Sequence, residues 1–144
     1  MAFGDIDNDG DQDLLEEMGG WFESDVAPSV LFKNPGHGNH FITLRLEGRR
    51  SNRSAIGARL KVHLAMAPGG RDVYLTAGTG GSFGGNSLQQ EIGLGAATGI
   101  EAIQVTWPAT GEVQMFRDVA MDRVYRVVEG ETGLQPVTVK VLSF

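Results

Sequence analysis

The chain has 144 residues, a formal net charge of −6 and no cysteine. This length suits a domain with a buried core, and the acidic balance argues against nucleic-acid binding, which relies on an excess of Lys and Arg. The absence of cysteine excludes disulfides and thiolate metal sites, and neither a membrane-spanning apolar run nor a signal peptide is recognisable.

The first predicted element is an acidic loop close to the start of the chain. Its carboxylates alternate with other residues, and a glycine lies at its tightest point: Asp5, Asp7, Asp9, Gly10, Asp11 and Asp13. Like charges this close together repel one another unless a cation lies among them, and hard oxygen ligands suit calcium. We predict a calcium site in which Asp5, Asp7, Asp9 and Asp13 supply carboxylates and Asp11 its backbone carbonyl.

Two other interpretations of this loop are available. The spacing also fits an EF-hand with Glu16 as its closing ligand. An EF-hand needs a helix on each side, and the stretch 1–4 is too short for one, while Gly19 and Gly20 would end the other at once. We therefore favour a calcium loop between two short strands. The remaining alternative is a solvated acidic turn, since Asp, Asn and Gly are ordinary turn residues.

Short alternating runs of apolar and polar residues follow the loop. They predict strands at 41–47, 58–64, 71–76, 88–92, 103–107, 113–117, 123–129 and 137–141. A period of two with one apolar face is typical of half-buried antiparallel strands, and roughly eight of them predict an all-β sandwich or barrel. We predict a loop at 76–86, which is rich in glycine, and a turn at 95–99.

Single residues have predicted structural roles within these strands and turns. Asn52 and Gly57 suit turn backbone with positive φ, and Trp107 would anchor the core before Pro108 ends its strand. Gly93 and Gly95 permit a bulge.

Signals for catalysis are weak. The stretch 80–84 matches the nucleophile-elbow pattern around Ser82, but more glycine follows it and no histidine lies beyond His63, which we expect to be exposed on a polar strand face. His37 and His40 are a candidate metal pair, although loop histidines more often act as caps or solvated groups. We expect no enzymatic activity.

Two further groups are candidate contact surfaces. Arg45, Arg49, Arg50 and Arg53 form a basic cluster that could meet an anion, and a solvated turn explains it more simply. Trp21 and Phe22 could stack on a ligand or partner, although packing against the rest of the chain is the more common role for such residues.

The residues resemble two known modules, in chain order. The stretch 3–14 resembles the calcium loop of an FG-GAP/VCBS repeat, the blade unit of integrin-type propellers, and 30–34 resembles the end of such a blade. Downstream, Gly48 and 51–59 resemble the opening signature of the ASPIC/UnbV family. Later matches lie at 93–95, 105–108 and 128–130. The resemblance implies a partial repeat over 1–35, followed by an all-β domain over 36–144 of the kind found at the C-terminus of extracellular propeller proteins.

Together these features predict a non-enzymatic calcium-binding module for extracellular recognition or adhesion. The resemblance implies an extracellular, cell-surface or periplasmic location, with a protein or glycan as the ligand. The alternatives are a structural module without a functional metal, which forms homo-oligomers through exposed strand edges, and a hydrolase.

Overall fold

The computed structural model describes residues 1–20, 22–24, 26–80, 85 and 87–143, and this part of the chain contains strands and no helix. No membrane-spanning helix is therefore found among these residues. The strands are β1 (Ala2–Gly4), β2 (Asp13–Glu16), β3 (Val30–Phe32), β4 (His40–Glu47), β5 (Arg59–Ala65), β6 (Arg71–Thr76), β7 (Gln89–Gly95), β8 (Gly99–Thr106), β9 (Val113–Val119), β10 (Arg123–Val128) and β11 (Gln135–Val137). The predicted all-β class is confirmed.

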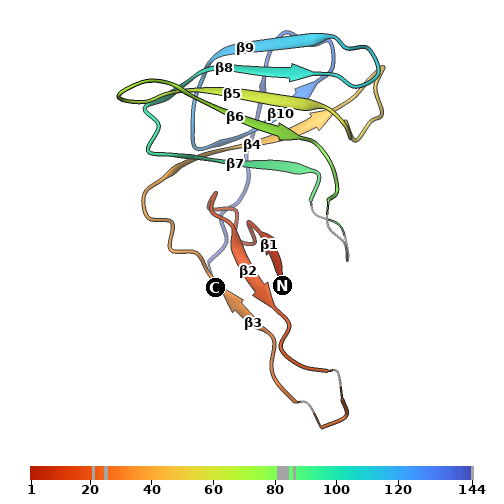
Figure 1. Cartoon of the computed structure of the whole chain (residues 1–144), viewed down its shortest axis with the longest axis vertical. Coiled ribbons are helices and arrows are strands. Elements are labelled where there is room, and N and C mark those ends of the chain that lie inside the picture. Colours follow the sequence, from red (N-terminus) through yellow and green to blue (C-terminus); the bar gives the residue numbers. More distant parts are fainter. Residues whose placement is uncertain (21, 25, 81–84, 86, 144) are drawn as a thin grey trace.

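Two four-stranded sheets form the body of the molecule. Their strand orders are β11-β10-β4-β7 and β6-β5-β8-β9, and they pack as a sandwich that does not close into a barrel (Figure 1). The alternation of apolar and polar residues along each strand places one face of each sheet inside the sandwich. On β5, the apolar residues Leu60, Val62 and Leu64 are buried, whereas Lys61 and His63 face outward. Burial of these apolar faces is the main stabilising contribution to the sandwich.

One strand pairing departs from the antiparallel arrangement that the sequence predicts. β10 runs parallel to β4, with Val124 beside Thr43 and Val128 beside Glu47, while β4 pairs antiparallel with β7. Each of these strands has the same period of two in either pairing, so the alternation could not reveal the direction.

The predicted roles of single residues are mostly confirmed. Trp107 follows β8 and is fully buried in the core. Gly95 faces His40 and Gly93 faces Phe41, so Leu94 is the extra residue of a bulge. The prediction for Asn52 was wrong: Ala55 takes the positive φ of 53° together with Gly57. Asn52 instead closes the turn with its amide, which bonds both the backbone N–H and the C=O of Ile56.

The prediction of a C-terminal strand over 137–141 was also wrong for most of that range. β11 ends at Val137, and the following residues leave the sheet and run to the acidic loop. There the Leu142 N–H donates to the Asp7 carbonyl over 2.8 Å. The hydrogen bonds that a strand would have made within the sheet are thus partly replaced by bonds to a distant segment.

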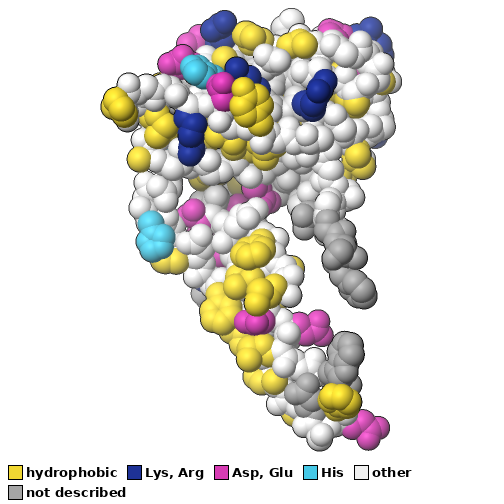
Figure 2. Space-filling model, in the orientation of Figure 1, with side chains coloured by type: hydrophobic (Ala, Val, Ile, Leu, Met, Phe, Trp, Pro, Cys, Tyr) yellow, Lys and Arg dark blue, Asp and Glu magenta, His cyan; other side chains and the backbone are white. Residues whose placement is uncertain are grey.

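Strands β1, β2 and β3 form a separate antiparallel sheet in the N-terminal arm, which we define as residues 1–35. The arm projects from the sandwich (Figure 1). Its small sheet leaves large apolar side chains in solvent on both of its faces, because the strand register places Phe3 and Phe32 on one face and Leu15 and Leu31 on the other. Figure 2 shows hydrophobic atoms along the arm.

Candidate metal centre

The acidic loop connects β1 to β2, so two short strands flank it, as the preferred interpretation predicted. The EF-hand alternative is excluded, because neither flank is helical and Glu16 lies within β2. Asn8 and Gly10 take positive φ values of 60° and 98°. These residues turn the backbone sharply enough to bring successive carboxylates to one side.

Hydrogen bonds to backbone N–H groups hold the loop in shape. The Asp5 carboxylate accepts from the N–H of Asp9 at 3.0 Å and from that of Gly10 at 3.1 Å. The carboxylate of Asp13 accepts from Ile6 at 3.2 Å and from Asn34 at 2.9 Å. Because Asp13 is almost fully buried, it ties the loop to the segment that follows β3.

Asp5, Asp7 and Asp9 come together as a set of potential metal ligands. One carboxylate oxygen from each lies within 4.8 Å of the others, and Asp7 is fully buried. Asp11 and Asp13 are outside this set of three. The structure therefore gathers three of the four predicted carboxylate ligands around one point, and the predicted backbone carbonyl of Asp11 is not among the side-chain atoms compared.

Lys33 is a residue of this site that the sequence did not suggest. Its ammonium group hydrogen-bonds to the Asp7 carboxylate and lies 3.5 Å from an oxygen of Asp9. The side chain is still 47 % exposed, and its stem is long and flexible. Lys33 thus brings a positive charge to two of the carboxylates that a metal ion would use.

The pKa values of the loop carboxyls show that Lys33 does not neutralise all of them equally. The hydrogen bond from Lys33 lowers the pKa of Asp7 despite the burial of that carboxyl, and Asp7 in turn raises the pKa of Lys33. Burial raises the pKa of Asp5 and Asp11, and the charge of Asp9 adds to both shifts. Lys33 therefore relieves Asp7, while Asp5 and Asp11 carry an unfavourable charge that a cation would compensate.

The loop also fastens the arm to the sandwich. Asn8 donates from its side chain to the Lys140 carbonyl at 3.2 Å, and Gln12 donates to the Glu91 carboxylate of β7 at 3.0 Å. Gly10 lies directly on the ring of Phe41, where an added Cβ would come within 2.1 Å of a ring carbon. The loop therefore makes the contacts that attach the arm to the sandwich.

Gly10→Val is expected to release the arm without unfolding the sandwich. Valine is strained at this positive φ, and its Cβ would collide with Phe41. Limited proteolysis should cut the variant within residues 1–35 faster than the wild type, while circular dichroism shows an unchanged β signal. Equal cleavage rates would contradict this role for Gly10. Gly20→Val is the matched control, because Gly20 also has positive φ and an added Cβ there meets no atom within 4 Å.

The other candidate residues do not assemble into sites of this kind. His40 contacts Asp122 at 2.8 Å, while His37 is exposed, and neither belongs to the metal-ligand set found among the described residues. His63 is 40 % exposed and contacts Asp72 and Glu101. Ser82 and Trp21 lie outside the described residues, and Phe22 is exposed.

The basic cluster is paired with nearby acidic and amide side chains. Each arginine has its own acceptor on the sandwich: Arg45 with Gln89, Arg49 with Glu131, Arg50 with Glu112 and Arg53 with Glu47. Pairs this exposed contribute little stability. The simpler interpretation as a solvated turn agrees with these contacts.

A buried carboxylate below that turn was not predicted. Glu129 is 3 % exposed, and one of its oxygens accepts the backbone N–H groups of Arg49, Arg50 and Ser51, each at 2.7 Å. The other oxygen meets the hydroxyls of Ser51 and Thr110. Burial by itself would raise the pKa of Glu129, but the backbone donors outweigh it and lower the pKa to about 2. The sequence signals at this position were a carboxylate directly after two apolar strand residues and the family resemblance of residues 128–130, and neither indicated burial.

Comparison with known proteins identifies the region that contains this turn. Residues 48–134 match the family model described as ASPIC and UnbV, from the glycine before the arginine turn to the residue before β11. No curated protein sequence matches the chain. The matched region includes Glu129 and most of the sandwich strands, whereas the acidic loop lies outside it.

Proposed function

The chain belongs to the ASPIC and UnbV family, and we propose that it is a non-enzymatic calcium-binding module for extracellular recognition or adhesion. The observation that carries the proposal is the convergence of Asp5, Asp7 and Asp9 within 4.8 Å of one another. The resemblance of residues 3–14 to an FG-GAP/VCBS calcium loop supports the same metal.

The donor set suits calcium in charge and chemistry. All three side chains offer hard carboxylate oxygens, and calcium takes about 6–8 oxygens in a flexible shell that backbone carbonyls and water can complete. Five acidic side chains crowd the loop, and Lys33 supplies one ammonium group to them. Bound calcium would supply the missing positive charge, and Asp5, Asp7 and Asp9 would hold it.

In this proposal the metal acts as a clamp. The loop bonds the C-terminal segment through Asp7 and Asn8, and it contacts β7 through Gln12. Neutralising the carboxylates removes the repulsion that opposes this arrangement, so the free energy of metal binding becomes free energy of ordering the arm. The ordered arm would present its exposed apolar side chains to a partner.

Lys33 favours a second candidate function, a structural module that uses no metal. If its ammonium group is the permanent counter-ion of Asp7 and Asp9, the loop needs no calcium, and the arm serves assembly through its exposed strand edges. The two candidates differ in whether Lys33 competes with calcium or replaces it.

Lys33→Met is expected to bind calcium about tenfold more tightly than the wild type, because a competing positive charge is removed from the site. Isothermal titration calorimetry with calcium chloride measures both affinities. Lys140→Met is the matched control, because Lys140 contacts the loop only through its backbone carbonyl. If neither protein releases or absorbs heat on titration with calcium, the metal site is refuted. If the arm becomes less ordered in Lys33→Met and calcium does not restore its order, the structural module is favoured.

A further inference from the structure

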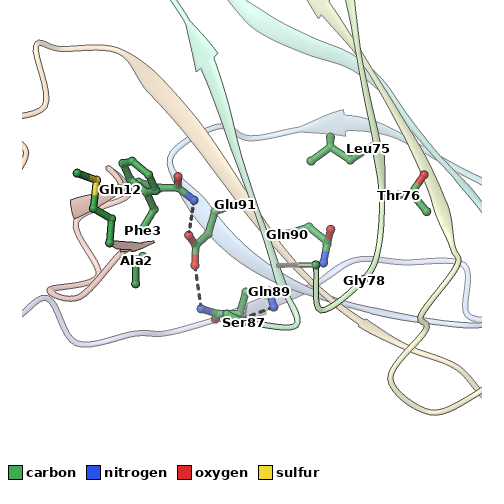
Figure 3. A pocket seen from close by; sticks show the side chains of 13 residues that line it. Ala2, Phe3, Gln12, Leu75, Thr76, Gly78, Ser87, Gln89, Gln90 and Glu91 are labelled. Atoms are coloured by element: carbon green, nitrogen blue, oxygen red, sulfur yellow. Dashed lines mark hydrogen bonds between the residues drawn. The ribbon is translucent and has the colours of Figure 1, made fainter. Parts of the chain in front are cut away.

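A cavity of about 520 Å³ lies between the N-terminal arm and the edge of the sandwich. Figure 3 shows side chains entering it from both walls. The residues that matter here are Phe3 and Gln12 from the arm, Thr76 from β6, and Gln89, Gln90 and Glu91 from β7. This volume falls within the ~300–1,000 Å³ typical of small-molecule sites.

Amide side chains make up much of the polar lining, and hydrogen bonds to neighbouring residues hold them in place. Gln90 is only 7 % exposed, and its NH₂ group donates to the Leu88 carbonyl at 3.0 Å. Among the described residues, no hydrogen bond engages its side-chain oxygen. A buried amide that borders a cavity, and whose acceptor no described residue engages, is an arrangement that a ligand donor would complete.

Glu91 joins the two walls. Its carboxylate accepts from Gln12 of the arm at 3.0 Å and from Gln89 at 3.4 Å (Figure 3). The oxygen of Gln89 accepts in turn from Arg45, which does not line the cavity. The amides are therefore oriented by a network that spans arm and sandwich.

The geometry points to a neutral, hydroxyl-rich saccharide as the ligand of this cavity. Amides and hydroxyls both donate and accept hydrogen bonds, and so do sugar hydroxyls. No Lys or Arg is among the described residues that line the cavity, and the one charged side chain among them is that of Glu91, so phosphates and acidic glycans are disfavoured. Phe3, 65 % exposed, offers an apolar ring to the C–H face of a sugar.

This inference rests in part on the proposed function, since one wall of the cavity belongs to the arm. Gln12 lies between Asp11 and Asp13, so a cation that fixes the acidic loop also fixes this side chain opposite Gln89. Saccharide binding is therefore expected to weaken when calcium is removed.

The test uses the full chain and immobilised neutral hexasaccharides of glucose, mannose, xylose and N-acetylglucosamine, with a heparin hexasaccharide and a neutral hexapeptide as competing classes. Binding is measured in about 1 mM calcium and in chelator. We expect retention on at least one neutral saccharide and about tenfold weaker binding for Phe3→Ala. Tyr74→Ala is the matched control, because Tyr74 is similarly exposed at 68 % and does not line the cavity.

Each outcome separates this inference from the metal proposal. If calcium raises the melting temperature and no neutral saccharide is retained, the saccharide site is overturned and the clamp remains. Preference for heparin or the peptide overturns it as well, as does equal binding by Phe3→Ala and the wild type. If saccharide is retained and is sensitive to Phe3→Ala, but calcium changes neither binding nor melting, the cavity is supported and the calcium clamp is refuted.

Discussion

Glu129→Ala is expected to lower the melting temperature by roughly 10–15 °C, from the loss of about 3–5 kcal/mol that follows when buried groups lose their charged partner. The carboxylate accepts three backbone N–H groups from the turn at residues 49–51, and alanine leaves them all without an acceptor. The turn opens the region shared with the family, so its loss should loosen that end of the sandwich.

Glu129→Gln removes the negative charge of this side chain and keeps its size and shape, so it shows how much of the stabilisation comes from the charge. The glutamine oxygen can still accept from the turn, and its NH₂ group can donate to Ser51 and Thr110, so we expect a loss of about 1–2 kcal/mol. Glu112→Ala is the matched control, because Glu112 pairs with Arg50 of the same turn at the surface. It should change the melting temperature by no more than about 2–3 °C.

The pH dependence of stability gives an independent check on Glu129. Its pKa is about 2 when folded, below its ordinary value of 4.5. A lowered carboxyl pKa stabilises the fold above the unfolded value, and this stabilisation is lost as the pH falls from about 5 toward 2. The stability difference between the wild type and Glu129→Gln should therefore shrink over that range. A constant difference, or equal melting at neutral pH, would refute the anchoring role.

Calcium is expected to raise the melting temperature of the wild type by roughly 6–10 °C. Binding to the folded state alone contributes about 2.7 kcal/mol when the ion is at 100 times its Kd. Asp9→Ala should abolish the shift, because Asp9 belongs to the ligand set and its carboxylate also accepts the N–H of Asp11. Thermal melts in about 1 mM calcium and in chelator measure the effect.

Glu17→Ala is the matched control for Asp9→Ala. It removes the same charge from an exposed position in the arm outside the loop. This variant should keep the full calcium shift. A wild type that melts identically with calcium and chelator would refute the clamp, and an equal loss of the shift in Glu17→Ala would show that net charge, and not the site, is responsible.

The local features of this protein could be predicted from its sequence. Leu60, Val62 and Leu64 alternate with polar residues, and that period determines which face of β5 is buried. The Asp–x–Asp spacing with Gly10 determines a tight loop with several carboxylates on one side, because the glycine permits the backbone turn. Gly93 and Gly95 indicated a bulge for the same local reason.

Contacts between distant residues were decided only by the tertiary structure. Glu129 reaches a turn about 80 residues earlier because β10 lies parallel to β4, and neither strand encodes that direction in its alternation. Lys33 enters the acidic loop because β3 pairs with β2, and the residues after Val137 leave their predicted strand and bring the Leu142 N–H to the Asp7 carbonyl. Period and turn chemistry act between near neighbours, whereas these contacts depend on how whole strands are placed.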